Sequence, residues 1–370
     1  MFIARDHQEQ GGLRGQLREI RVGNGNAGFY GLGMKFPRVV FSVLVAALSL
    51  VGCGQPSETE DSGGGDAALK IAVIPKGTTH EFWRSIETGA RKAEQELNAD
   101  QPTVEVIWKG PLKEDDREQQ MQVIDNFTTR RVSGIVLAPL DSKAMVRPVE
   151  TAEKAGIPVV VIDSGLDSES YVSFVATDNF KGGQMAGQFM GELLGGKGNV
   201  ILLRYAVGSA STEKRENGFL EALKAFPDIT LVSSDQYAGP TRETAYQSSQ
   251  NLLNRFGKEV DGIFCVNENS TIGMTKALRE IGRAGGEVKM LGFDAGSQSI
   301  KDMANGDVQG LVVQDPVKMG YEGVMTMVKK LNGEEVPRRI DTGVVMVTPE
   351  NMQEPAVQEL LNPPFDKYLK

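Results

Sequence analysis

From Leu69 onward the sequence alternates short β-branched runs with longer stretches of helical period. The apolar runs lie at 70–75, 103–108, 134–138, 157–162, 171–176, 198–204, 229–233, 261–266, 287–292 and 308–313. Between them, apolar residues recur at helical spacing in stretches such as 82–97, 117–130, 179–194, 213–226, 243–256 and 270–281. Continuous apolar strands that alternate with helices are typical of parallel sheets covered on both faces.

Ten strands are too many for one compact open sheet, so the pattern predicts an α/β fold with two doubly wound parallel-sheet lobes. The length of 370 residues also favours two domains over one. A TIM barrel is the alternative that the same alternation allows. In doubly wound sheets ligands bind beyond the carboxyl ends of the strands, so the residues that follow each strand are the candidate site.

The segment 34–52 has the features of a signal peptide. Lys35 and Arg38 precede an uncharged run of 13 residues from Val39 to Val51, which is shorter than the roughly 20 residues that span a bilayer. The run ends in Leu-Val-Gly before Cys53, and this ending resembles the lipobox of bacterial lipoproteins. An uncleaved signal anchor or a buried helix is the alternative interpretation.

The lipobox makes Cys53 the expected lipidation site and Met34 the expected true start, with residues 1–33 an upstream extension. Residues 53–68 are polar and Gly-rich, which is typical of a flexible tether. We therefore expect a lipoprotein that is exported and held at a membrane, in the periplasm or cell envelope.

Composition excludes several classes of protein. The formal net charge of −9 argues against nucleic-acid binding through phosphate contacts. The chain has only two histidines, His7 and His80, and two cysteines, Cys53 and Cys265. These are too few for Cys/His zinc clusters, a disulfide framework or a Ser/His/Asp site after the signal peptide. No metal or cofactor is expected, and Cys265, inside an apolar run, is expected to be a core thiol.

The expected strand ends carry carboxylates, amides and aromatic rings. The residues that we single out as ligand-binding are Lys76, Thr79, His80, Phe82, Trp83, Asp163, Ser164, Glu213, Asn267, Asp294 and Gln314. Aromatic rings cover the C–H faces of a sugar, and planar polar groups bind its hydroxyls in pairs. Taken singly, these side chains could instead be helix caps or core residues. A glycosidase carboxylate pair is not excluded by the sequence.

Seven motifs in order carry a family resemblance. They are IAVIPKGTTHEFWRSIETGA at 71–90, IPVVVIDS at 157–164, TDNFKGGQMAG at 177–187, SASTEKRENGFLEAL at 209–223, FCVNE at 264–268, LGFDA at 291–295 and VVQDP at 312–316. With them the chain resembles the ribose/galactose-type periplasmic sugar-binding proteins, the substrate-binding subunits of bacterial ABC transporters. The resemblance runs from about Leu69 to Val347.

The resemblance implies a type I periplasmic binding protein fold with a hinge of several crossings, near 176–179, 313–316 and 340–344. One lobe would comprise 69–177 plus 315–341, and the other 178–314 plus 342–370. It implies a monomer that closes around a small sugar-like ligand and delivers it to a membrane permease. A ligand sensor of the same fold is the alternative, and a repressor would need a DNA-binding helix-turn-helix where this chain has a signal peptide.

By the same resemblance, Phe82 and Trp83 occupy the positions that sandwich the sugar ring, and the polar residues Asp163, Asn267, Asp294 and Gln314 bind its hydroxyls. The sequence departs from the ribose-binding pattern at Ser164 and Glu213, which replace arginines, and at Lys76, His80 and Ala138. Ribose itself is therefore in doubt, and Lys76 beside an acidic neighbour such as Glu213 suggests a sugar acid or a polyol. Arg215 is expected to be structural, and the glycines Gly182, Gly183 and Gly187 to allow close helix packing.

Overall fold

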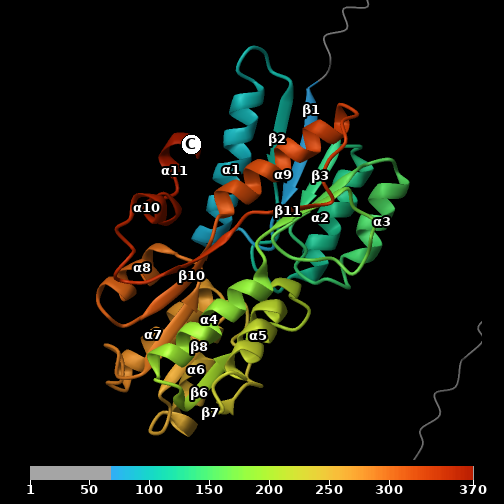
Figure 1. Ribbon diagram of the computed structural model, residues 1–370. Helices are drawn as coiled ribbons and strands as arrows, with labels where there is room; N and C mark the ends of the chain where they lie inside the picture. The colour runs from blue at the N-terminus through green and yellow to red at the C-terminus, as the bar shows by residue number, and fades with distance from the viewer. Residues whose placement is uncertain (1–67, 370) are drawn as a thin grey trace, which may run out of the picture. The chain divides into compact units, whose positions relative to one another are not determined.

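The computed structural model describes residues 68–369 (Figure 1). The predictions for the upstream extension, the signal peptide, Cys53 and most of the tether lie outside the described residues. Within residues 68–369, no helix is both long and apolar enough to span a membrane.

The first sheet is entirely parallel and has the order β11-β5-β4-β3-β1-β2. Its strands are β1 (Leu69–Ile74), β2 (Val104–Trp108), β3 (Gly134–Leu137), β4 (Val159–Ile162), β5 (Ser173–Ala176) and β11 (Arg339–Asp341). Alternate strand residues pack on opposite faces. Its helices are α1 (Glu81–Leu97) and α9 (Pro316–Leu331) on one face and α2 (Arg117–Thr129) and α3 (Val146–Lys154) on the other. We call this sheet and its helices lobe 1.

The second sheet repeats the order as β12-β10-β9-β8-β6-β7. Its strands are β6 (Lys197–Leu203), β7 (Asp228–Ser233), β8 (Gly262–Cys265), β9 (Lys289–Phe293), β10 (Gly310–Gln314) and β12 (Val344–Val347), of which β12 is antiparallel to β10. Its helices, which complete lobe 2, are α4 (Asn179–Leu193), α5 (Ala210–Leu223), α6 (Arg242–Phe256), α7 (Glu268–Glu280) and α8 (Ser297–Ala304).

Three connections pass from one sheet to the other: β5 to α4, β10 to α9, and β11 to β12. Thr177 in the first connection donates its hydroxyl to the carbonyl of Gly343 in the third at 3.0 Å. After β12 the chain forms α10 (Pro355–Leu361), which packs on the lobe 2 core, and α11 (Phe365–Tyr368), which contacts α1 (Figure 1).

All ten predicted strands are present, and their division into two parallel-type sheets confirms the doubly wound α/β prediction and excludes the barrel. The strands β11 and β12 were not predicted. Cys265 is fully buried, as expected. A Cβ on Gly183 would lie 2.0 Å from the Arg215 carbonyl oxygen, so the close packing of α4 on α5 depends on glycine as predicted.

Candidate functional site

Two aspartates mark the carboxyl ends of equivalent strands in the two sheets. Asp163 follows β4 and Asp294 follows β9, each the third strand in its sheet order. Both adopt left-handed backbone conformations, with φ of +61° and +71°. This region costs a residue other than glycine about 1–3 kcal/mol, and such residues cluster at functional sites. Both side chains are buried and face a region where the two lobes meet.

Part of this region is filled by the chain's own polar side chains. We call Lys76, His80, Trp83, Glu114, Asp163 and Tyr205 the inner cluster. The Lys76 ammonium lies 3.0 Å from the Asp163 carboxylate, with both side chains about 95% buried. The same ammonium donates across the lobes to the hydroxyls of Ser211 at 3.1 Å and Ser209 at 3.4 Å. Each of these side chains has at least one partner within the protein, although His80 Nδ1 makes no hydrogen bond among the described residues and lies 3.4 Å from Glu268 Oε2.

The centre of the inner cluster is the Glu114 carboxylate, which comes from the loop between β2 and α2. It accepts hydrogen bonds from the indole of Trp83 at 2.5 Å and from the hydroxyl of Tyr205, and it pairs with His80. Tyr205 belongs to lobe 2, so Glu114 joins the lobes. The Trp83 indole N–H, expected near a ligand, is thus bound to a carboxylate of the protein.

Charge in the inner cluster is set by burial and by close partners. Burial opposes ionisation of Glu114, but His80 and the hydrogen bonds outweigh it and lower the Glu114 pKa to about 2. Burial likewise opposes a charged His80, but Glu114 and Glu268 raise its pKa to about 10. The geometry therefore favours a charged pair across the neutral pH range.

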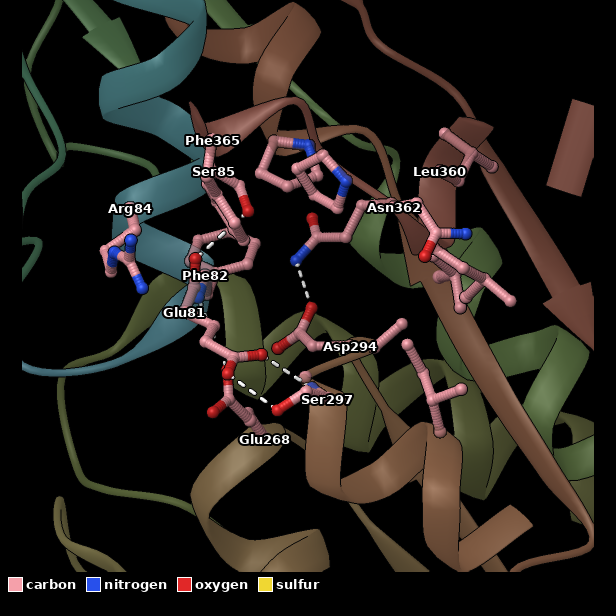
Figure 2. Close-up of a pocket in the computed structure, with 18 of the residues that line it drawn as sticks. Glu81, Phe82, Arg84, Ser85, Glu268, Asp294, Ser297, Leu360, Asn362 and Phe365 are labelled. Atoms are coloured by element: carbon pink, nitrogen blue, oxygen red, sulfur yellow. Dashed lines mark hydrogen bonds between the residues drawn. The ribbon is translucent and has the colours of Figure 1, made fainter. Parts of the chain in front are cut away.

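Beside the inner cluster lies a cavity of about 480 Å³, which we call the outer pocket (Figure 2). This volume is within the roughly 300–1,000 Å³ that is typical of small-molecule sites. Its lining comprises Glu81, Phe82, Arg84, Ser85, Glu268, Asp294, Ala295, Gly296, Ser297, Ile300, Lys301, Val313, Gln314, Pro316, Leu360, Leu361, Asn362, Pro363 and Phe365. Both lobes and the segment after β12 contribute to it.

Asp294 and Gln314 form the polar side of the outer pocket. The Gln314 amide donates to Asp294 Oδ1 at 2.7 Å, and Arg215 Nη1 lies 3.6 Å from Asp294 Oδ2. Burial raises the pKa of Asp294, and Arg215 and Gln314 counteract that increase. The Gln314 Oε1 atom is buried and has no hydrogen-bond partner among the described residues. An acceptor in this state can receive a hydrogen from a ligand hydroxyl.

The eleven predicted residues therefore divide into groups. Phe82, Asp294 and Gln314 line the outer pocket, and Lys76, His80, Trp83 and Asp163 belong to the inner cluster. The Ser164 hydroxyl accepts from the Ser211 backbone N–H at 3.1 Å, so it lies beside the inner cluster.

Three of the eleven lie elsewhere. Asn267 caps α7 by accepting from the Ser270 backbone N–H. Thr79 is exposed, and Glu213 is exposed on α5, where it accepts from the Gly208 backbone N–H. The acidic partner of Lys76 is accordingly Asp163 and not Glu213, because Asp163 follows a strand of the same sheet as Lys76.

Arg215 is buried, donating to the Asn179 side chain at 2.8 Å and to the Val266 carbonyl at 2.9 Å. Its guanidinium also lies 3.7 Å from the centre of the Phe293 ring. These contacts fit its expected structural role and also place a cation behind Asp294.

Sequence reasoning missed Glu114, Tyr205, Glu268 and the segment after β12. Glu268 accepts from the Phe82 backbone N–H at 3.4 Å, lies 3.4 Å from His80 Nδ1 and pairs with Arg242 at 2.8 Å. Tyr205 and Glu268 lie just beyond the ends of β6 and β8, and this position was the available signal. Glu114 lies within the polar loop 109–116, where nothing local separates it from its acidic neighbours.

Comparison with known proteins places this architecture in a family. Residues 71–335 match the periplasmic binding protein domain. The ribose import binding protein of Haemophilus influenzae is 29% identical over 278 residues, which is 75% of this chain and 91% of that protein. This chain belongs to the periplasmic binding protein family. The resemblance drawn from the strand-end motifs is thereby confirmed for family and fold.

Solved structures of other solute-binding proteins have the same fold as this chain. A solute-binding protein from Agrobacterium radiobacter in complex with D-arabinose is 33% identical, with a TM-score of 0.75 over 80% of this chain and 100% of that chain. One from Agrobacterium vitis with bound D-fucose is 33% identical, with a TM-score of 0.74 over 79% of this chain and 100% of that chain. The family consists of binding proteins, so this chain is not an enzyme, as its sequence predicts.

Proposed function

We propose that this protein is an extracytoplasmic receptor that binds a neutral sugar or polyol between its lobes and delivers it to the permease of an ABC transporter. The observation that carries the proposal is the outer pocket, where Phe82 of lobe 1 and Asp294 and Gln314 of lobe 2 line one cavity. An aromatic ring beside a carboxylate and an amide suits a ligand with C–H faces and hydroxyls.

The charges around the site favour a neutral ligand over a sugar acid. Lys76 is already paired with Asp163, and Arg215 is bound to Asn179 and Val266. The buried charges that line the outer pocket are the carboxylates of Glu268 and Asp294, whereas its cations, Arg84 and Lys301, are exposed. An added carboxylate inside the pocket would therefore meet like charge. The similar proteins named for ribose, D-allose, D-arabinose, D-fucose and xylitol support a neutral sugar or polyol.

The proposed motion is closure of the lobes, 69–177 plus 315–341 against 178–314 plus 342–370, about the three connections. Contacts that need both lobes, such as Glu114 with Tyr205 and Lys76 with Ser211, support it. Closure around a ligand would shield its hydroxyls from water, and the ligand would stabilise the closed form by its differential affinity.

A thermal-shift screen of those five compounds tests ligand binding. A compound at about 100 times its dissociation constant stabilises the native state by about 2.7 kcal/mol. Small-angle scattering should then show a smaller radius of gyration with the bound compound than without it, because the lobes close. Absence of any stabilisation by these sugars and polyols would contradict the proposed ligand class.

The membrane anchor is a second part of the proposal and rests on the lipobox that ends at Cys53. Replacing Cys53 by Ser should leave the precursor unprocessed or release the protein from the membrane fraction. Membrane fractionation and metabolic labelling with a fatty acid measure this. A Cys53→Ser protein that is still processed and labelled would show that the anchor lies elsewhere.

A further inference from the structure

The segment after β12 contacts both lobes beside the outer pocket. Val357 and Leu361 of α10 are buried in the core of lobe 2. Four residues further on, α11 packs against α1 of lobe 1, where the Arg84 guanidinium lies 4.7 Å from the centre of the Phe365 ring. Residues 355–368 therefore have a fixed position that depends on contacts with each lobe.

The same segment closes one side of the cavity. Leu360, Leu361, Asn362, Pro363 and Phe365 line the outer pocket together with the candidate binding residues. In Figure 2, Phe365 lies near Ser85 and Phe82 on one side of the pocket, and Leu360 and Asn362 lie on the other, above Asp294. A ligand held by Asp294 and Gln314 would thus have the C-terminal segment as a neighbour.

A second observation supports a ligand in this cavity. Gln314 is only 2% exposed, yet its Oε1 atom has no hydrogen-bond partner among the described residues, while its amide group is fixed by Asp294. A buried acceptor without a partner is unfavourable unless a ligand or a water supplies a donor.

We infer that the segment 355–368 is the outer wall of the ligand pocket and that Phe365 determines which sugar fits it. The inference rests on the proposed function, because it assigns specificity within the same site. The half-buried Phe365 ring gives the pocket an apolar surface beside its polar groups. A ring at this place contacts a C–H face and limits the size of the ligand.

Two variants of α11 form a matched pair for the test. Phe365 lines the outer pocket, whereas Tyr368, on the same short helix, does not. Titration calorimetry of the full chain, Phe365→Ala and Tyr368→Ala uses D-ribose, D-allose, D-arabinose, D-fucose and xylitol. Phe365→Ala should weaken the tightest-bound compound by about tenfold and change its preference over the next, since an aromatic face is lost. Tyr368→Ala should leave both quantities within about twofold, because Tyr368 does not line the pocket and surface substitutions away from a site have small effects.

A second measurement needs no ligand. Ser85 is 4% exposed and lines the pocket, so Ser85→Cys places a thiol behind the wall. In a chain that also carries Cys53→Ser, the other thiol is the fully buried Cys265. Maleimide should label Cys at 85 several-fold faster when Phe365→Ala is added than when Tyr368→Ala is added.

The two measurements separate the two proposals. Equal labelling rates and equal affinities in the Phe365 and Tyr368 variants would overturn the inference that the segment 355–368 is the outer wall of the pocket. Faster labelling of the Phe365 variant in a chain that binds none of the five compounds would support the wall and contradict the proposed ligand class.

Discussion

Asp163 and Asp294 occupy equivalent places in two sheets of the same strand order, and both have a left-handed backbone. Their surroundings differ. Asp163 lies 3.0 Å from a buried ammonium that is itself bound to serines of the other lobe. Asp294 lies 3.6 Å from its arginine, accepts from Gln314 and lines an open cavity. One strand end is therefore filled by the protein's own side chains, and the other places a carboxylate at the wall of a cavity.

The comparison shows that an aspartate after a buried strand does not always line a cavity. Its role depends on the cation that the fold places beside it. Lys76 follows β1 of the same lobe and reaches Asp163 directly, whereas Arg215 is held behind Asp294 by Asn179 and Val266.

The largest effect is expected on the free energy of unfolding, when the ion pair between Lys76 and Asp163 is broken. Asp163→Ala leaves the Lys76 ammonium buried without its carboxylate, so the free energy of unfolding should fall by about 3–5 kcal/mol. Urea denaturation of the ligand-free protein measures it. Asp294→Ala is the matched control and should lose clearly less, because its ion pair is longer. Equal losses would mean that the two aspartates do not differ in role.

For ligand affinity, we expect the larger loss in the Asp294 variant and the smaller loss in the Asp163 variant. Asp294→Ala removes the acceptor for ligand hydroxyls, so the tightest-bound sugar or polyol should bind about 5- to 150-fold more weakly, a loss of roughly 1–3 kcal/mol. Calorimetry on Asp294→Ala and on Asp163→Asn measures the contrast. A comparable loss in Asp163→Asn would show that the inner cluster also contacts the ligand.

The inner cluster should also make stability depend on alkaline pH. Within the fold, the carboxylates of Glu114 and Glu268 raise the pKa of His80 from its ordinary 6.5 to about 10. The stabilisation is complete below pH 6.5 and is lost as the pH rises to about 10, with a slope of at most about 1.4 kcal/mol per pH unit. Urea midpoints between pH 6.5 and 10 measure it. Glu114→Gln should flatten the slope, and an unchanged slope would exclude this pair as its cause.

The smallest effect is expected at Glu213. It is exposed on α5, and among residues 68–369 the one hydrogen bond of its side chain is to the nearby Gly208 backbone. Glu213→Ala should therefore change stability and sugar affinity by less than about 0.5 kcal/mol. The same denaturation and calorimetry apply. A marked loss of affinity would place Glu213 at the ligand after all.

The sequence predicts much of the fold because strand and helix periodicity is a local property. All ten apolar runs form strands, and the two strands that escaped notice, β11 and β12, have only three and four residues. The pattern in Arg339–Asp341 is too polar to indicate a strand. These residues are extended because they pair with β5 at the sheet edge.

Less of the site is visible in the sequence. Asp163 and Asp294, which directly follow strands, and Phe82, in the first turn of the helix after β1, could be predicted because strand ends converge. The partner of each side chain could not, since it depends on tertiary contacts. Glu114 looks like any acidic loop residue until Trp83, His80 and Tyr205 surround it, and Phe365 follows two prolines that interrupt every periodic pattern.

The split of lobe 1 along the chain has a consequence for how the protein can fold as it emerges from a ribosome. One face of its first five strands is covered by α1 and by α9, which lies in the last fifth of the chain. Val324 and Met327 of α9 are fully buried against that face. Until they arrive, the valines and isoleucines of β1, β3 and β4 have no complete cover. The core of lobe 1 can therefore be completed only after most of lobe 2 has been synthesised.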